Sequence, residues 1–183
     1  MEKSVDAVRD VLPEIADISD PQLRAKVENI WLQVWKESEW DNLADVPKNV
    51  GKDNGIKLLV HVRSVIRISM AMADSIAHFH GVKVDQDRLL AATILHDVDK
   101  VLLYAPNGSK SPMYKALPHT LYTAHKMLEH GLDHELVNMV ITHSENHCTK
   151  APMSVEAMIL KHGDHGESEA VRMAVDVLGK VNA

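Results

Sequence analysis

The sequence has little cysteine, few aromatic residues and no long apolar run. Cys148 is the single cysteine among 183 residues, so no intrachain disulfide can form, and this usage is typical of a reducing compartment. No apolar run is long enough to cross a bilayer, and no signal-peptide pattern opens the chain. A net charge of −6, without a basic cluster, argues against binding a nucleic-acid polymer. We therefore expect a cytoplasmic protein that binds neither membranes nor nucleic acid.

Hydrophobic spacing predicts a single all-α domain, a helical bundle of about seven helices, because apolar residues recur every three or four positions and no strand-like alternation occurs. Asp20 and Asp133 are suited to cap helices, as is either Asp85 or Asp87, and Gly81 is a natural stop. After the helix that begins at Pro21, the expected helices cover about residues 56–79, 88–104, 118–130, 133–148, 153–162 and 167–181.

Histidine is the residue in excess, with twelve in the chain. His96 and Asp97 directly follow the apolar run 91–95, where buried charges need a partner. A divalent cation would satisfy both side chains, which are common metal ligands. The alternative is a helix whose last turn happens to be polar.

Four further residues extend this pair to a constellation. His61, His119, His143 and Asp164 each lie in an apolar helical context or at the end of one. Each alone is more often a hydrogen-bonded core residue, but helix bundles build metal sites from side chains on facing helices. Four imidazoles and two carboxylates suit two divalent transition metals per chain, such as Fe, Mn, Zn, Ni or Co, and are too rich in nitrogen for Mg or Ca alone.

The order of these residues resembles the HD-domain superfamily of metal-dependent phosphohydrolases. The resemblance covers about residues 58–166 and rests on the segments LLVHVR (58–63), LLAATILHD (89–97), VITHS (140–144) and LKHGD (160–164). It implies an HD core at 56–166, preceded by a helical extension at 1–50 and followed by a C-terminal helix at 167–183. It also implies that His61, His96, Asp97 and Asp164 bind one metal, and that His119 and His143 complete a second site with Asp97 as the bridge.

Several roles stay open at this point. His125 competes with His119 as the fourth imidazole. Lys100 lies three residues after Asp97 on the same helix face and is either a phosphate contact or an ion-pair partner of Asp97 or Asp99. Asp99 itself has no assigned role and is expected to face solvent.

His147, four residues after His143, is either a substrate contact or proton shuttle, or part of a solvated helix end.

The resemblance implies a hydrolase that cleaves a phosphoester of a small metabolite or nucleotide with a metal-activated water, with Asp97 and Lys100 as catalytic residues. The expected partner is a small anionic substrate, and an oligomer is compatible with the sequence. No glycine-rich phosphate loop occurs, so the substrate stays open. The resemblance also covers HD-type diiron oxygenases, which have the same ligand set, and the further alternatives are a hydrolase of non-phosphate bonds on the same metal scaffold and a catalytically silent binding module.

Overall fold

A computed structural model of the chain describes residues 2–50, 55–144 and 148–178. Apart from two isolated β-bridges, no strand occurs among these residues, and the predicted all-α class is confirmed. The helices are α1 (Val5–Val11), α2 (Pro21–Glu37), α3 (Leu58–His80), α4 (Gln86–Leu95), α5 (Lys100–Leu103), α6 (Pro112–Ala116), α7 (Leu121–Glu129), α8 (His134–Ile141) and α9 (Val155–Leu178), with 3₁₀ helices η1 (Pro13–Asp17) and η2 (Leu43–Asp45).

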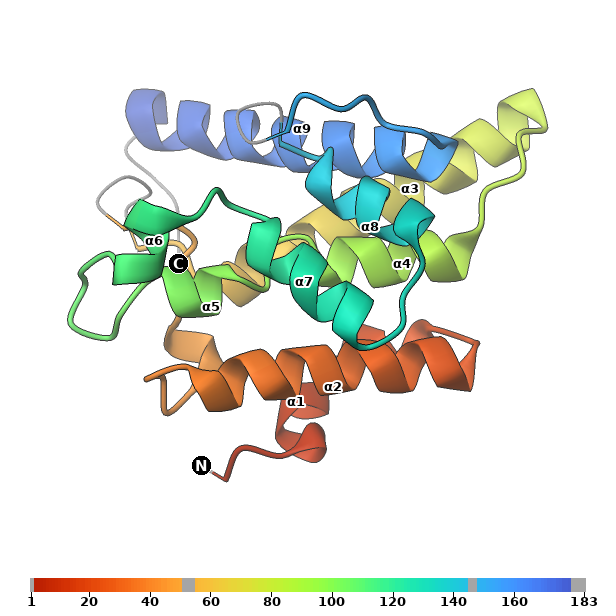
Figure 1. Cartoon of the computed structure of the whole chain (residues 1–183). Coiled ribbons are helices and arrows are strands. Elements are labelled where there is room, and N and C mark those ends of the chain that lie inside the picture. Colours follow the sequence, from red (N-terminus) through yellow and green to blue (C-terminus); the bar gives the residue numbers. More distant parts are fainter. Residues whose placement is uncertain (1, 51–54, 145–147, 179–183) are drawn as a thin grey trace.

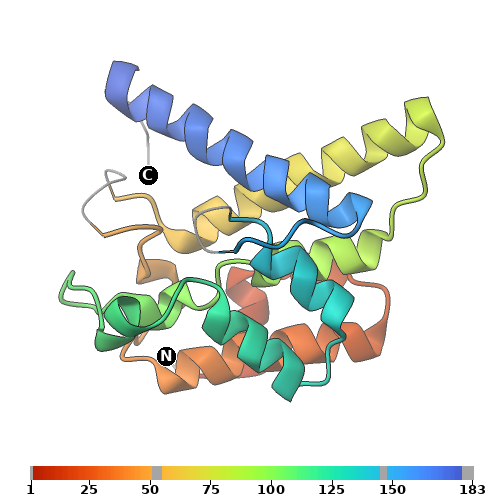
Figure 2. The ribbon, with the colours of Figure 1, turned by 45° about the horizontal axis from the view of Figure 1, so that its top comes forward.

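Helix α4 is the centre of the bundle. Every residue from 89 to 95 is buried, and the helix contacts α2, α3, α8 and α9. Figure 1 shows α2 and α9 on opposite sides of α4, and Figure 2 shows α9 crossing α3. A helix that is apolar on all sides must be covered on all sides, which explains this arrangement.

The predicted helix 88–104 is wrong as one element, because it breaks after Leu95. Val98 N–H donates to the Leu95 carbonyl and Lys100 N–H to that of Asp97, so residues 96–99 form tight turns between α4 and α5. The break leaves the Ile94 carbonyl without its helical donor, and the indole N–H of Trp31 in α2 donates to it at 3.1 Å. The N-terminal helices therefore stabilise the turn that carries His96 and Asp97.

The predicted division of the C-terminal part into helices 153–162 and 167–181 is also wrong, since α9 runs unbroken through this region. Gly163 lies inside the helix and faces Ser69 of α3, where a Cβ would meet the Ser69 hydroxyl oxygen at 2.5 Å. The missing side chain lets α9 approach α3 closely. The packing contact outweighs the low helix propensity of glycine.

The predicted capping residues are found at the helix ends, whereas several helix lengths differ from the prediction. Asp20, Asp85 and Asp133 each accept a backbone N–H as N-caps, and Gly81 ends α3 in the left-handed conformation, with φ +65°. The short helix α6 was not predicted, and α8 ends at Ile141, earlier than expected. No helix in the described part of the chain is both long and apolar enough to span a membrane.

The contact between Gly163 and Ser69 makes a testable prediction. Gly163→Ala should lower the free energy of unfolding by about 1–3 kcal/mol, because the added methyl group overpacks the α3–α9 contact. In a Ser69→Ala background the same substitution should instead stabilise by about 0.5–1 kcal/mol, the usual gain for alanine over glycine in a helix. Urea unfolding measures both values.

Gly166→Ala is the matched control, because a Cβ at this position in the same helix meets nothing within 4 Å. It should stabilise the protein on its own. The interpretation is wrong if Gly163→Ala and Gly166→Ala shift the unfolding midpoint alike.

Candidate metal centre

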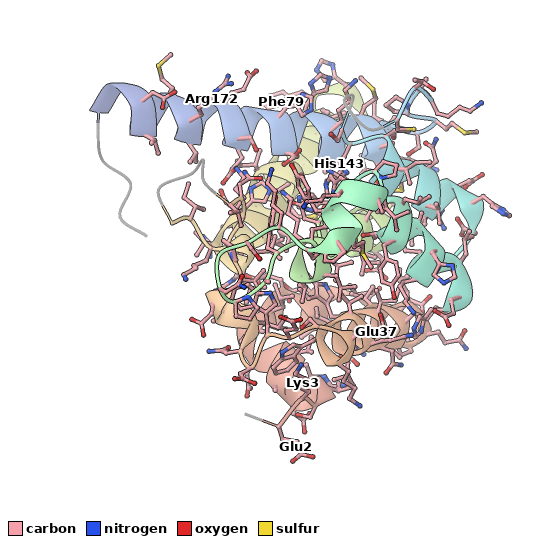
Figure 3. All side chains as sticks on the ribbon, turned by 60° about the vertical axis from the view of Figure 1, so that its left-hand side comes forward. Glu2, Lys3, Glu37, Phe79, His143 and Arg172 are labelled. Carbon is pink, nitrogen blue, oxygen red and sulfur yellow. The ribbon has the colours of Figure 1, made fainter. Side chains whose placement is uncertain are left out.

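Six predicted residues from five segments of the fold converge on one buried centre. They form two groups, in each of which the candidate ligand atoms all lie within 4.8 Å of one another. The first group is His61 of α3, His96 after α4 and Asp164 of α9, and the second is Asp97, His119 before α7 and His143 after α8. Figure 3 shows His143 below α9.

The first group is compact. His61 Nε2 lies 3.1 Å from Asp164 Oδ1 and 3.3 Å from His96 Nε2. Both imidazoles are fully buried, and they meet edge to face. The close approach of α9 to α3 at Gly163 brings the neighbouring Asp164 within reach of His61.

Asp97 directs one oxygen to each group. Its Oδ2 lies 3.3 Å from His61 Nε2 and 3.4 Å from His96 Nε2, while its Oδ1 lies 2.9 Å from His119 Nε2 and 3.9 Å from His143 Nε2. A carboxylate in this position can bind two cations, one through each oxygen. The tight turn after α4 makes this possible, because it carries Asp97 out of the helical path.

All four imidazoles are oriented in the same way. His96 Nδ1 lies 2.6 Å from the Thr93 carbonyl, and His143 Nδ1 lies 2.6 Å from the Val140 carbonyl. The Nδ1 atoms of the other two face carboxylates, Glu167 for His61 and Asp99 for His119. In a neutral imidazole, an Nδ1–H that donates to such acceptors leaves Nε2 with its lone pair, and all four Nε2 atoms point to the centre.

The carboxylates create a negative field at the centre. Burial alone would lower the pKa of His61, but Asp164, Asp97 and Glu167 raise it to about 9. Burial also lowers the pKa of His119, but Asp99 and Asp97 outweigh it and raise this pKa to about 9. Deep burial, reinforced by His96, instead lowers the pKa of His143 to about 3 and keeps it neutral. Such a field attracts a cation, whether proton or metal.

These residues fit a divalent metal ion. Oδ1 of Asp97 is buried, which is costly for a carboxylate oxygen unless a positive charge or a metal lies beside it. It lies beside two Nε2 atoms, and the donor set of imidazoles and carboxylates is the one that Fe, Mn, Zn, Ni or Co accept.

The structure also resolves which of the open residues lie at the centre. It brings His119 to Asp97, whereas His125 is exposed and its ring lies near Tyr122. Lys100 Nζ donates to Asp97 Oδ2 at 2.6 Å, and the residue also lines a pocket. It therefore makes the expected ion pair with Asp97 and is also placed where it could contact a phosphate. His147 falls outside the described residues.

The expectation that Asp99 faces solvent is wrong. Its side chain is buried, with Oδ1 3.1 Å from His119 Nδ1, and Oδ2 accepts the Thr120 N–H at 2.7 Å. Sequence spacing could not reveal this contact, because the turn after α4 and the approach to α7 decide it.

A pocket of about 600 Å³ opens onto the centre. Asp97, His119, His143 and Asp164 form part of its wall, together with residues that sequence reasoning missed: Lys48, Tyr104, Ser168 and Arg172. Glu167, also missed, lies three residues after Asp164 on the same helix face, and this spacing was the available signal for it. No comparable signal exists for Lys48, which lies in a loop far away in the sequence.

Comparisons with known proteins agree with this geometry. The HD domain family matches residues 58–167. A curated relative, dihydroneopterin 2',3'-cyclic phosphate phosphodiesterase of Methanocaldococcus jannaschii, is 28% identical over 124 residues, which cover 66% of this chain and 49% of the relative. The match thus spans about half the length of that protein. No solved structure matches the sequence significantly.

The raised pKa values predict how the stability of the metal-free protein depends on pH. A histidine whose folded pKa is about 9 contributes stability that is fully present below pH 6.5 and is lost as the pH rises through 9. The free energy of unfolding in EDTA should therefore fall between pH 6.5 and 9, by up to about 3 kcal/mol for each histidine. Urea unfolding at several pH values measures this slope.

His119→Gln should remove part of the slope, and His125→Gln, at the exposed neighbour, should leave it unchanged. Equal slopes in all three proteins would contradict the assignment. With metal in excess the trend should reverse, because the ion displaces these protons.

Proposed function

The chain belongs to the HD domain family, and on this premise we propose that it is a metal-dependent phosphohydrolase that cleaves a phosphoester bond of a small metabolite or nucleotide. One observation carries the proposal. The candidate ligands are not all sealed in the core: His61 and His96 are fully buried, but Asp97, His119, His143 and Asp164 line a pocket large enough for a nucleotide-sized ligand.

The proposed ligands are His61, His96 and Asp164 for one divalent transition metal, and His119 and His143 for a second, with Asp97 shared between them. Bound metals supply an activated water near neutral pH and offset the negative charge that develops on the phosphoryl group. The protein contributes the fixed orientation of its four imidazoles and the exclusion of bulk water from Asp97, which is buried.

The pocket supports an anionic substrate through its cations. Lys100 is partly buried beside the ligands, and its pKa is raised because the nearby Asp97 outweighs the effect of burial. Its ammonium group, 2.6 Å from Asp97 Oδ2, is the cation best placed to contact a phosphoryl oxygen. Arg172 adds positive charge to the same pocket wall.

The relative supports a finer proposal for the substrate. Its printed activity is hydrolysis of a 2',3'-cyclic phosphate carried by a pterin. A cyclic phosphodiester of a pterin or nucleoside is therefore the first compound to test on this chain.

We also extend the proposal to the whole chain as one HD-type domain, with residues 1–50 as a helical extension. A continuous hydrophobic core supports this, since it includes Val8 of α1, Trp31 of α2 and Leu160 of α9. The indole of Trp31 also bonds to the carbonyl before the metal-ligand turn, which ties the extension to the proposed site.

Asp97→Asn tests the site. The substitution keeps the volume of the side chain and removes the charge shared by both groups, so metal content should fall from two ions per chain to less than one. Hydrolysis of a cyclic phosphodiester should fall by at least about 10³-fold. Metal analysis after gel filtration and phosphate-ester turnover measure the two effects.

Asp176→Asn, on an exposed face of α9, is the matched control and should change neither quantity. The site assignment fails if Asp97→Asn retains full metal content and turnover. Turnover that requires oxygen and bound iron would instead favour an oxygenase, and tight ligand binding without turnover would favour a binding module.

Lys100→Met tests the proposed phosphate contact. Loss of the ammonium group should lower kcat by about 10²–10³-fold, the usual effect of removing one donor to a transition-state oxygen. Metal content should stay at the wild-type level, because Lys100 is not a ligand. Arg172→Gln, an exposed cation at the same pocket, should have a smaller effect, and an equal effect of both would contradict the special role of Lys100.

A further inference from the structure

Two buried carboxylates lie behind the centre and belong to neither ligand group. Asp99 faces Nδ1 of His119, and Glu167 faces Nδ1 of His61. Each group therefore contains one histidine backed by a carboxylate, while its other histidine, His96 or His143, is backed by a peptide carbonyl.

The Asp99 carboxylate contacts His119 and the next residue, Thr120. Its two oxygens lie 3.1 and 3.2 Å from His119 Nδ1, and Oδ2 also accepts the Thr120 N–H at 2.7 Å. Thr120 has φ +75°, the only positive φ of a non-glycine residue among the described positions. A β-branched residue rarely adopts this conformation, and strain of this kind persists only where its surroundings hold it. Asp99 thus fixes both the imidazole and the backbone that carries it.

Glu167 makes the corresponding contact with Nδ1 of His61 in the first ligand group, but its carboxylate also pairs with Lys48. Oε2 lies 2.7 Å from His61 Nδ1 and 3.1 Å from Lys48 Nζ, and the same ammonium group donates to Ser168 Oγ at 3.0 Å. Lys48 and Glu167 are both buried, so little solvent screens this pair.

We infer that Asp99 and Glu167 are positioning residues that set the affinities of the two metal sites separately, Asp99 through His119 and Glu167 through His61. A carboxylate that accepts Nδ1–H fixes the tautomer and makes Nε2 a stronger donor to a metal. Asp99 has the larger effect, because Lys48 already offsets part of the charge of Glu167. The inference rests on the metal centre of the proposed function.

The experiment is a Co²⁺ titration of the metal-free full-length protein, followed by calorimetry and by the visible absorption of bound cobalt. The wild type should show two sites. Asp99→Asn should weaken one of them by about 10–100-fold and leave the other within about twofold. Glu167→Gln should weaken the other site, and by less.

A double variant separates positioning from a general structural role. In a His119→Ala background, which removes the proposed ligand, Asp99→Asn should have no further effect on cobalt affinity, because two residues that act through one contact are not additive. If Asp99→Asn alone does not fold, Thr120→Gly relieves the backbone strain at this position, and the titration compares Thr120→Gly with Thr120→Gly/Asp99→Asn.

The outcomes keep the two proposals apart. The inference is overturned if Asp99→Asn changes neither affinity, lowers both equally, or acts undiminished without His119. Two cobalt sites that respond as expected, in a protein that cleaves no phosphoester, would overturn the hydrolase proposal and leave the inference intact. A wild type that binds no cobalt would overturn both.

Discussion

Burial of the Asp97 carboxylate is the constraint around which the fold is arranged. A charge removed from water must be compensated within the protein, and the groups available here are one ammonium and several imidazoles. Those groups come from α3, α5, the approach to α7 and the end of α8, so four segments must meet at the end of α4. Further carboxylates lie behind the imidazoles and, together with Asp97, raise the pKa values of His61 and His119 to about 9. A site that holds protons this firmly is also one that a divalent cation can occupy in their place.

The helices could be predicted from the sequence because they follow from local patterns, whereas the assignment of the six residues to two sites was implied by their resemblance to the HD-domain superfamily. Apolar spacing of three and four residues marks the helices, and each histidine or aspartate interrupts such a pattern. The break after Leu95 could not be predicted, since apolar spacing continues through Val98 and Val101. The indole that donates to the freed Ile94 carbonyl, that of Trp31, lies 63 residues away. The buried role of Asp99 escaped prediction for the same reason: its partner lies in another element.

The continuity of α9 shows how packing can override propensity. Two glycines in four residues suggest a helix end, yet Gly163 is needed where α9 crosses α3. Because the helix does not break, Asp164, Ser168 and Arg172 follow one another at four-residue spacing along one face. One helix thus supplies a candidate ligand and the pocket wall beyond it, and Glu167 on the adjoining turn reaches back to His61.

The two oxygens of Asp97 have different partners. This difference links binding of an anion in the pocket to binding of a cation by the ligand groups. Oδ2 accepts a hydrogen bond from the ammonium group of Lys100, while Oδ1 lies 2.9 Å from His119 Nε2. A cation beside His119 and His143 would replace the proton of His119 that faces Oδ1, whereas one beside His61 and His96 must share Oδ2 with the ammonium group of Lys100. An anionic ligand in the pocket would draw Lys100 toward itself and away from Oδ2, because both acceptors compete for the same cation. Binding of an anion in the pocket and binding of a cation beside His61 would then favour each other, because each is helped when the contact between Lys100 and Asp97 Oδ2 is broken.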